Sequence, residues 1–307
     1  MPMLERIAGN RELKQDLKTA LGSGRIAHSI LLVGEPGCGA GFAARCLAAD
    51  YLYPAGGPHA EAVLKKEDTE CLVLQGEGAS GQIPVKKVRE AREAIQRSAL
   101  STDAAGRVLF IYGAQNLNGS SANAMLKIIE EPPEGVLFLL TATSAATVLP
   151  TIRSRCAAYT IAPVPAADCA ARLKAERLPA KAAEELAFLY EGHIGTALKS
   201  WNDPTAKAAL GMAKTLCGYA AQGDTYRALA LLTKYERDKD GFAALLWTLD
   251  QLCSAVLRRP AYGQEQCGGL TPAGAAKILN ADARARKSLT GNGNLRLNVA
   301  VLAGEIA

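Results

Sequence analysis

A glycine-rich loop directly follows the first long apolar run of the chain, and it constrains the fold more than any other segment. Ser29–Val33 has the composition of a buried strand, residues 34–41 carry four glycines, and an apolar helix is predicted from Phe42 onward. A strand, a glycine-rich turn and a helix in this order form a phosphate-binding loop, in which backbone N–H groups at the helix N-terminus bind phosphate. The segment predicts an α/β fold with nucleotide-binding ancestry.

The side chains of this loop lack the groups that nucleotide chemistry needs. A working phosphate loop supplies a Lys for the β- and γ-phosphates and a Ser or Thr for Mg²⁺. Ala40 and Gly41 occupy these two positions. We therefore expect no bound cofactor in this chain. The glycines that we expect to keep the shape of the loop without a phosphate are Gly34, Gly37 and Gly39.

A second element of nucleotide hydrolysis is also missing. In ATPases with such a loop, a later buried strand ends in acidic residues, of which one helps to hold Mg²⁺ and another polarises water. The apolar strand predicted at Val108–Tyr112 runs into Gly113-Ala-Gln-Asn116, which contains no acid. The architecture indicates a nucleotide-binding ancestor, whereas the residues indicate that this chain does not hydrolyse nucleotide.

The length of 307 residues is sufficient for two or three domains. A formal net charge of +5 permits contact with nucleic acid without demonstrating it. No apolar run reaches the roughly 18–20 residues that span a bilayer, and the N-terminus has no apolar signal segment. We expect a cytoplasmic protein without a membrane partner.

The eight cysteines of the chain are scattered, and no two are spaced as a C-x-x-C pair. This spacing signals neither a zinc site nor a redox motif. We expect reduced thiols and no bound metal.

Strands and helices alternate over the first half of the chain. We predict strands at 29–33, 70–74, 108–112, 136–141 and 158–161, and helices at 10–22, 42–51, 85–99 and 120–130. Strands separated by helices predict a parallel sheet that is covered by helices on both faces.

Strand signals stop after Pro163, and the rest of the chain is predicted to be helical. The expected helices are 166–176, 179–191, 195–201, 204–221, 224–237, 239–259, 271–287 and 292–306. Gly263–Gly269 is the best candidate for a mobile loop. We expect three domains: an α/β domain at 1–163, a small helical domain at 164–203 and an all-helical domain at 204–307.

Arg153 and Arg155 lie in a short polar segment beyond the strand predicted at 136–141, where α/β folds place binding sites. Such arginines are solvated or paired locally, or one of them is an arginine finger. In the latter case the planar, permanently charged guanidinium stabilises phosphate in a neighbouring subunit. A basic helix face is a solvated face more often than a DNA contact; its members here are Lys86, Lys87, Arg89 and Arg92.

Three strings together resemble the bacterial DNA polymerase III clamp-loader family. They are Arg25–Gly34, Asn123–Pro133 and Thr151–Cys156, and they occur in the order and spacing of that family. The resemblance covers about the first 200 residues. It implies an AAA+ α/β domain, a helical lid and a C-terminal helical collar that mediates oligomerisation.

Within that family the sequence favours the delta-prime type over the gamma/tau ATPase type. Gly195 stands where the ATPase would have the arginine of its second sensor motif, so three catalytic parts are lost together. The resemblance implies that Arg155 acts as an arginine finger in trans, that Ser154 and Cys156 support its loop, and that Arg153 makes a supporting ion pair. ATP and Mg²⁺ would be bound by the neighbouring subunit.

The partners implied by the resemblance are a gamma/tau-type ATPase and a delta-type subunit in a hetero-oligomer, and through it the sliding clamp and primer-template DNA. The family's four-cysteine zinc module has no counterpart, because Cys71 is the one cysteine within residues 51–80. Two alternatives remain open at this point. One is a nucleotide-binding AAA+ ATPase of the gamma/tau type, and the other is a stand-alone DNA-binding protein of AAA+ descent.

Overall fold

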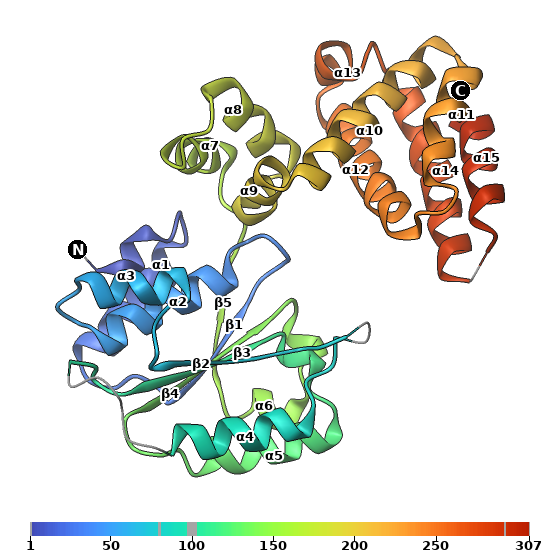
Figure 1. Cartoon of the computed structure of the whole chain (residues 1–307). Coiled ribbons are helices and arrows are strands. Elements are labelled where there is room, and N and C mark those ends of the chain that lie inside the picture. The colour runs from blue at the N-terminus through green and yellow to red at the C-terminus, as the bar shows by residue number, and fades with distance from the viewer. Residues whose placement is uncertain (1, 79–80, 97–102, 292, 307) are drawn as a thin grey trace. The chain divides into compact units, whose positions relative to one another are not determined.

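The computed structural model describes residues 2–78, 81–96, 103–291 and 293–306. Contacts divide the chain into two compact units. The first comprises Met1–Ala180 with Glu191–Thr196, and the second comprises Lys181–Tyr190 with Ala197–Ala307. Within the described residues, every strand belongs to the first unit and the second unit is helical (Figure 1). The three-domain division with boundaries at 163 and 203 stays a prediction.

The first unit is built on a parallel five-stranded sheet with the order β2-β3-β4-β1-β5. Its strands are β1 (Ser29–Val33), β2 (Cys71–Gln75), β3 (Arg107–Tyr112), β4 (Val136–Ala142) and β5 (Ala157–Thr160). Leu31 of β1 is in register with Leu140 of β4 on one side and Ala158 of β5 on the other. The predicted α/β class and all five predicted strands are confirmed, with bounds that shift by one residue at most.

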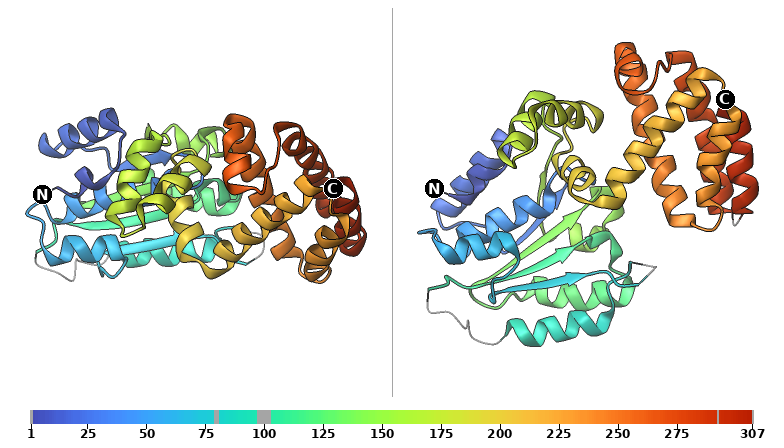
Figure 2. Two further views of the ribbon diagram at one scale, coloured as in Figure 1. Left: turned by 90° about the horizontal axis from the view of Figure 1, so that it is seen from above. Right: turned by 45° about the horizontal axis from the view of Figure 1, so that its top comes forward.

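Helices cover both faces of this sheet, as Figure 2 shows from two further directions. They are α1 (Arg11–Gly22), α2 (Ala40–Leu52), α3 (Pro58–Lys65), α4 (Val85–Ile95), α5 (Gly119–Glu130) and α6 (Pro150–Arg153). The helix α7 (Ala166–Ala175) follows β5 in the same unit. Because side chains alternate along a strand, β3 serves two cores. Val108 and Phe110 pack with α1 and α2, whereas Leu109 and Ile111 pack with α4 and α5.

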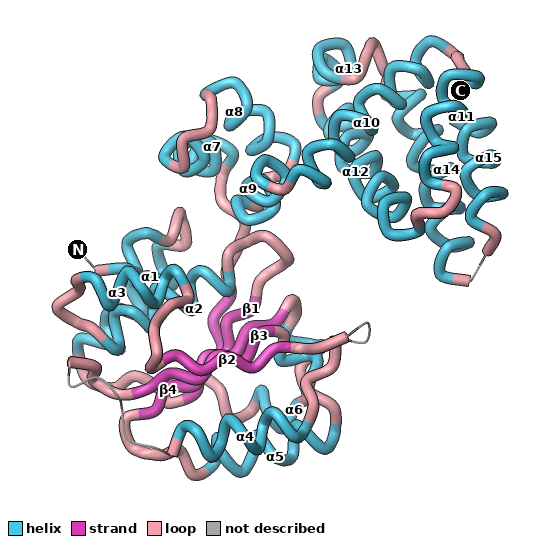
Figure 3. Tube along the Cα trace, viewed as in Figure 1, coloured by secondary structure: helices cyan, strands magenta, loops and turns pink. Residues whose placement is uncertain are grey.

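The second unit buries its apolar residues around α12. Its helices are α10 (Pro204–Gln222), α11 (Thr225–Leu232), α12 (Lys239–Arg258), α13 (Pro260–Gln266), α14 (Pro272–Thr290) and α15 (Leu295–Ile306), with most of α8 (Ala180–Leu189) and α9 (Ile194–Asn202). The first residue of α8 and the first three of α9 belong to the first unit. Phe242, Leu249 and Leu252 of α12 are fully buried, and this helix packs on α10 and α14. Figure 3 draws the helices of this unit in cyan, and all the magenta strands belong to the first unit. None of the described helices combines the length and apolar character of a membrane crossing.

The predicted mobile loop at Gly263–Gly269 is wrong in its first part, because α13 continues through Gln266. Gly263 is buried, and a Cβ on it would lie 2.0 Å from the Leu270 carbonyl oxygen. The glycine is there for close packing, a role that looks the same in the sequence as flexibility. The helix predicted at 224–237 is also shorter, since α11 ends at Leu232 and a 3₁₀ turn, Thr233–Tyr235, follows. Part of the helix predicted at 85–99 lies outside the described residues.

Candidate functional site

The glycine-rich loop joins β1 to α2 at the carboxyl edge of the sheet. Gly37 and Gly39 have φ angles of 93° and 99°, a region that glycine enters without the steric cost of a Cβ. The Gly34 N–H donates a hydrogen bond to the Ala142 carbonyl at 3.0 Å, which fixes the loop to β4. The three glycines predicted to shape this loop therefore have specific places in it.

A later segment of the same unit, residues 192–196, packs directly on this loop. The Gly195 N–H donates to the Gly37 carbonyl at 2.8 Å. A Cβ on Gly37 would lie 2.0 Å from Thr196 Oγ1. His193 Nε2 lies 3.1 Å from Glu35 Oε2. The loop thus contacts protein at Glu35 and Gly37, and the position that would carry the second sensor arginine, Gly195, is one of the contacting residues.

Tyr112, at the end of β3, fills the space beside the loop position that would carry the Mg²⁺-binding hydroxyl. A Cβ on Gly41 would lie 3.4 Å from Cε1 of this ring and 3.8 Å from Arg45 Nη1. Burial raises the pKa of the Tyr112 hydroxyl above its usual value, and the nearby Arg45 guanidinium opposes this. Sequence reasoning noted only that Tyr112 is not acidic. Its position as the last residue of a strand adjacent to the loop is the signal that would have placed it here.

Arg155 lies on the surface, in the turn between α6 and β5. Its side chain is 40% exposed, and its Nη2 lies 2.7 Å from Glu130 Oε1 at the end of α5. Its Nη1 donates to the Thr151 carbonyl at 3.0 Å. These contacts hold the side chain in one direction and leave part of the guanidinium open to solvent. The Asn123–Pro133 string and the Thr151–Cys156 string therefore meet in space through Glu130 and Arg155.

The neighbours of Arg155 have different surroundings. Ser154 Oγ is exposed and donates to the Thr151 carbonyl at 3.2 Å, and Arg155 Nη1 lies 3.4 Å from the same oxygen atom of Ser154. Cys156 is half-buried against the α4–α5 core, and burial raises the pKa of its thiol to about 11. The expected ion pair of Arg153 is replaced by a hydrogen bond from its Nη1 to the Ala145 carbonyl at 3.1 Å. The ion pair described in this loop belongs to Arg155.

A family model described as "DNA polymerase III, delta subunit" matches residues 9–165, just over half of the chain. The chain belongs to this DNA polymerase III family. The match includes both the glycine-rich loop and the Arg155 turn, so the two features of the site lie within the region that defines family membership. The resemblance that the sequence motifs indicate is thereby confirmed.

Individual relatives are DNA polymerase III subunits. The subunit gamma/tau of Mycobacterium bovis is 34% identical over 155 residues, which cover 48% of this chain and 27% of that protein. The subunit delta' of Escherichia coli is 29% identical over 210 residues, 68% of this chain and 57% of that protein. The matched region thus spans less than three fifths of the length of either relative. A RuvB mutant from Thermotoga maritima has a TM-score of 0.53 and 17% identity, over 100% of this chain and 88% of its own, which shows the AAA+ fold.

This member of the DNA polymerase III family also has a basic pocket on the α4–α5 face, with a volume of about 210 Å³. Its charged lining residues are Arg89, Arg92 and Lys127. Only two of the four residues of the predicted basic helix face line this pocket. The other two, Lys86 and Lys87, form ion pairs with Glu90 and Glu77. Among the described residues, the three cations of the pocket have no ion-pair partner. Sequence reasoning missed Lys127, which lies on a helix 38 positions away from Arg89 along the chain.

Within residues 51–78, where the sequence predicts that a zinc module is absent, the chain forms α3 and β2. Cys71 is half-buried at the start of β2, and burial, with the nearby Asp68 and Glu70 carboxylates, raises the pKa of its thiol. Tyr53 donates a hydrogen bond to Asp68 Oδ2 at 2.9 Å and stacks on His59. Across the part of the chain that the structure describes, no group of three or more His, Cys, Asp or Glu side chains is arranged as a metal site. Among the described residues, Cys71 therefore lacks the neighbouring donors that a zinc site of three or four ligands needs.

Proposed function

We propose that the chain is an ATPase-inactive, delta-prime-type subunit of a bacterial DNA polymerase III clamp loader, which donates Arg155 to the ATP site of a neighbouring gamma/tau-type subunit. The observation that carries this proposal is a contrast within one AAA+ unit. Its arginine turn presents an exposed guanidinium, whereas its own phosphate loop is packed against residues 192–196. We expect the protein to work in the cytoplasm.

We expect no ATP hydrolysis by this chain, because the glycine-rich loop lacks a positive charge and the space beside Gly41 is filled. With Ala40 in place of Lys, no side chain of the loop neutralises the negative charge of the β- and γ-phosphates. Tyr112 and Arg45 occupy the surroundings of Gly41, where a Mg²⁺-binding hydroxyl would otherwise lie. A rigid loop that is held by its own lid segment suits a stator, a subunit that keeps its conformation while its neighbours change theirs.

The role of Arg155 follows from the chemistry of its side chain. A guanidinium is permanently charged and stabilises the charge that develops on a transferred phosphoryl group. Glu130 holds Nη2, and the Thr151 carbonyl accepts from Nη1, so the side chain is oriented before a partner binds. In the assembly, phosphate oxygens of the neighbour's ATP would compete with Glu130 for this guanidinium. Ser154 and Cys156 would set the loop that carries it.

Oligomerisation through the collar is supported by an apolar patch on the second unit. Large apolar side chains are exposed on α11 and α15, which pack on each other. The members of this patch are Tyr226, Leu229, Leu297 and Val301. Tyr226 is 82% exposed and Leu297 is 63% exposed. Contiguous exposed apolar surface marks protein–protein contacts. We propose that these four side chains form such a surface and that the collars of the gamma/tau-type and delta-type subunits cover it.

Contact with primer-template DNA is supported by the basic pocket between α4 and α5. Arg89, Arg92 and Lys127 are free to bind the phosphate backbone, and such contacts would be weakened by salt. We propose that DNA held by the assembled loader, together with the sliding clamp, reaches this face. Unchanged DNA binding by a reconstituted loader that carries Arg89→Ala and Arg92→Ala would contradict this part of the proposal.

The isolated chain tests whether it is instead an ATPase of the gamma/tau type. Equilibrium dialysis with Mg-ATP is expected to give no saturable binding at ATP concentrations that saturate a gamma/tau subunit in the same buffer. Turnover assays on the same samples are expected to stay at background. Saturable ATP binding together with ATP hydrolysis would contradict our proposal and would show that the chain is an ATPase of the gamma/tau type. Tight, salt-dependent DNA binding by the chain alone would favour a stand-alone DNA-binding protein.

A further inference from the structure

The sheet of the first unit has an open edge at β5. This strand is last in the sheet order and pairs with β1 on one side. The Ile161 N–H donates to the Val33 carbonyl at 2.7 Å, so Ile161 directs its N–H toward β1. Since successive residues of a strand direct their backbone groups to opposite sides, Ala158, Thr160 and Ala162 direct theirs outward.

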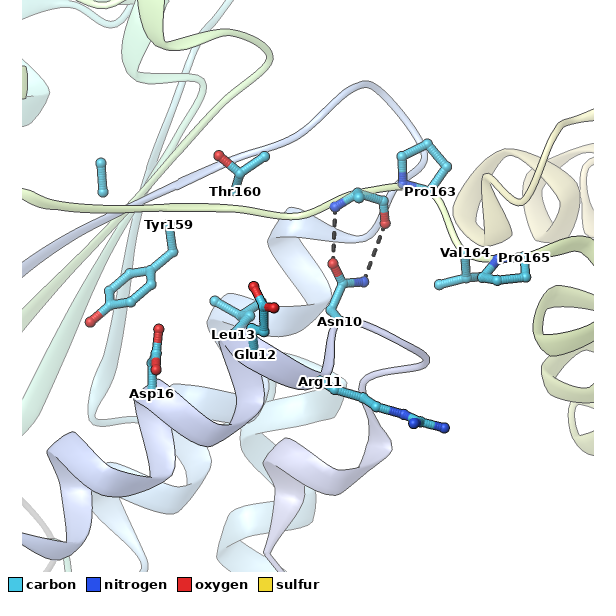
Figure 4. A pocket seen from close by; sticks show the side chains of 12 residues that line it. Asn10, Arg11, Glu12, Leu13, Asp16, Tyr159, Thr160, Pro163, Val164 and Pro165 are labelled. Carbon is cyan, nitrogen blue, oxygen red and sulfur yellow. Dashed lines mark hydrogen bonds between the residues drawn. The ribbon is translucent and has the colours of Figure 1, made fainter.

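Asn10 already binds one of these outward residues in the way that a neighbouring strand would. Its Oδ1 accepts a hydrogen bond from the Ala162 N–H at 3.0 Å, and its Nδ2 donates to the Ala162 carbonyl at 3.2 Å (Figure 4). A residue of an added strand makes this same pair of bonds through its backbone. The outward N–H and carbonyl groups of Ala158 and Thr160 have no hydrogen-bond partner among the described residues. Two consecutive docking positions are thus open next to one that is filled.

A groove of about 590 Å³ runs between this edge and α1. Its walls include Tyr159 of β5 and two carboxylates of α1, Glu12 and Asp16. Both carboxylates are exposed, and neither has an ion-pair partner in the described part of the chain. In Figure 4 they lie on the side of the groove with Tyr159, while the guanidinium of Arg11 extends away from them. The groove beside the open edge is therefore acidic.

We propose that β5 receives an extended segment of another protein as an additional strand, and that this segment carries Lys or Arg at alternate positions. Backbone hydrogen bonds to Ala158 and Thr160 would supply the pairing, as in other peptides that extend a sheet edge. Tyr159 packs on the α1 side of the sheet, so residues of the incoming strand opposite it direct their side chains to the same side. Basic side chains there meet Glu12 and Asp16. This surface is separate from the function proposed above and does not depend on it.

The test uses the full chain and the capped peptide Lys-Val-Lys-Val-Lys, with Glu-Val-Glu-Val-Glu as its charge-reversed control. Binding is measured by calorimetry, and hydrogen exchange is followed at the amides of Ala158 and Thr160. Thr160→Pro removes an outward N–H without removing a bond to β1, a substitution that edge strands tolerate. Glu12→Gln with Asp16→Asn removes the two charges. Glu93→Gln, an exposed charge on α4, is the matched control.

The lysine peptide is expected to bind and to slow exchange at both amides. The Glu12→Gln/Asp16→Asn variant should weaken binding by about fivefold, as expected for losing two exposed ion pairs. Thr160→Pro should abolish binding, and Glu93→Gln should not change it. Circular dichroism verifies that Thr160→Pro is folded; the charge variant tests the proposal independently if it is not.

Equal binding of the glutamate peptide, or unchanged exchange at Ala158 and Thr160, would overturn the proposal. Dimerisation of the chain without peptide, lost in Thr160→Pro, would assign the edge to a second copy and would likewise overturn it.

Discussion

At the scale of single residues, the site is defined by what replaces the missing catalytic groups. The Gly37 carbonyl accepts a hydrogen bond from the Gly195 N–H, and the Tyr112 ring lies beside Gly41. The sequence shows that a Lys and a hydroxyl are absent from the loop. It does not show that Thr196 and Tyr112 approach the loop, because these contacts join residues that lie far apart along the chain.

A pair of glycine substitutions isolates the contact between the loop and Thr196. Gly37 and Gly39 both have positive φ, so Ala at either position has a conformational cost of about 1 kcal/mol. A Cβ at Gly37 also meets Thr196, whereas a Cβ at Gly39 has no neighbour within 4 Å. Gly37→Ala is therefore expected to destabilise the first unit more than Gly39→Ala does. Hydrogen exchange in β1 and α2 measures this difference, and equal effects would show that segment 192–196 does not hold the loop.

Asp282 gives the second unit a defined pH dependence. The residue is 2% exposed, and burial raises the pKa of its carboxyl from 3.8 to about 6, although Arg286 lies 2.6 Å away and opposes this. A raised pKa means that folding favours the protonated form. The contribution of Asp282 to the free energy of unfolding is therefore largest below pH 4, falls as the pH rises toward 6, and is lost above that.

The Asp282→Asn variant tests this dependence. A pKa shift of this size corresponds to about 3 kcal/mol. The unfolding free energy of the wild type should therefore fall by about that amount between pH 4 and pH 6, and that of the variant should not. Trp201 and Trp247 both lie in the second unit, so urea unfolding followed by tryptophan fluorescence reports on it. Parallel pH profiles for the variant and the wild type would contradict the assignment.

At the scale of secondary-structure elements, the sequence predicts the regular parts well. Continuous apolar runs such as Val108–Tyr112 are strands because both faces of a parallel sheet are buried, and this leaves a clear pattern. Gly263 shows the limit of that reasoning, since a glycine packed against the Leu270 carbonyl and a glycine in a flexible loop look identical in the sequence. The Arg155–Glu130 ion pair could not be predicted from the sequence either, because it depends on where α5 ends relative to the turn after α6.

Two helical glycines test the packing of α13. A Cβ at Gly263 would lie 2.0 Å from the Leu270 carbonyl oxygen, whereas Gly211 in α10 has open space around it. Gly263→Ala is expected to destabilise the second unit by about 1–3 kcal/mol, because overpacking forces the backbone to move. Gly211→Ala is expected to stabilise it by up to about 1 kcal/mol through helix propensity. Urea unfolding measures both changes. An unchanged free energy of unfolding for Gly263→Ala would show that Gly263 is not tightly packed and would favour the predicted loop.

At the scale of the whole molecule, our proposal is that the chain contributes to an active site of a neighbouring subunit without having one of its own. The AAA+ unit has the sheet, the glycine-rich loop and the Arg155 turn, and the helical unit exposes Tyr226 and Leu297, through which we propose that it assembles. Family membership could be predicted from three strings of residues, because their order along the chain is itself specific. The neighbour of Arg155 could not be predicted in the same way, because no feature of one chain fixes the register of an interface.

The central claim is tested most directly by reconstituting the loader with wild type or Arg155→Ala and measuring DNA- and clamp-stimulated ATP hydrolysis. Loss of an arginine finger lowers the rate at its own site by about a thousandfold or more, so the total rate should fall by that site's share while the complex stays intact by size-exclusion chromatography. Arg153→Ala, which removes the neighbouring exposed arginine that binds the Ala145 carbonyl, should hydrolyse ATP as the wild type does. An intact Arg155→Ala loader with the wild-type hydrolysis rate would contradict the claim that this chain completes the active site of its neighbour.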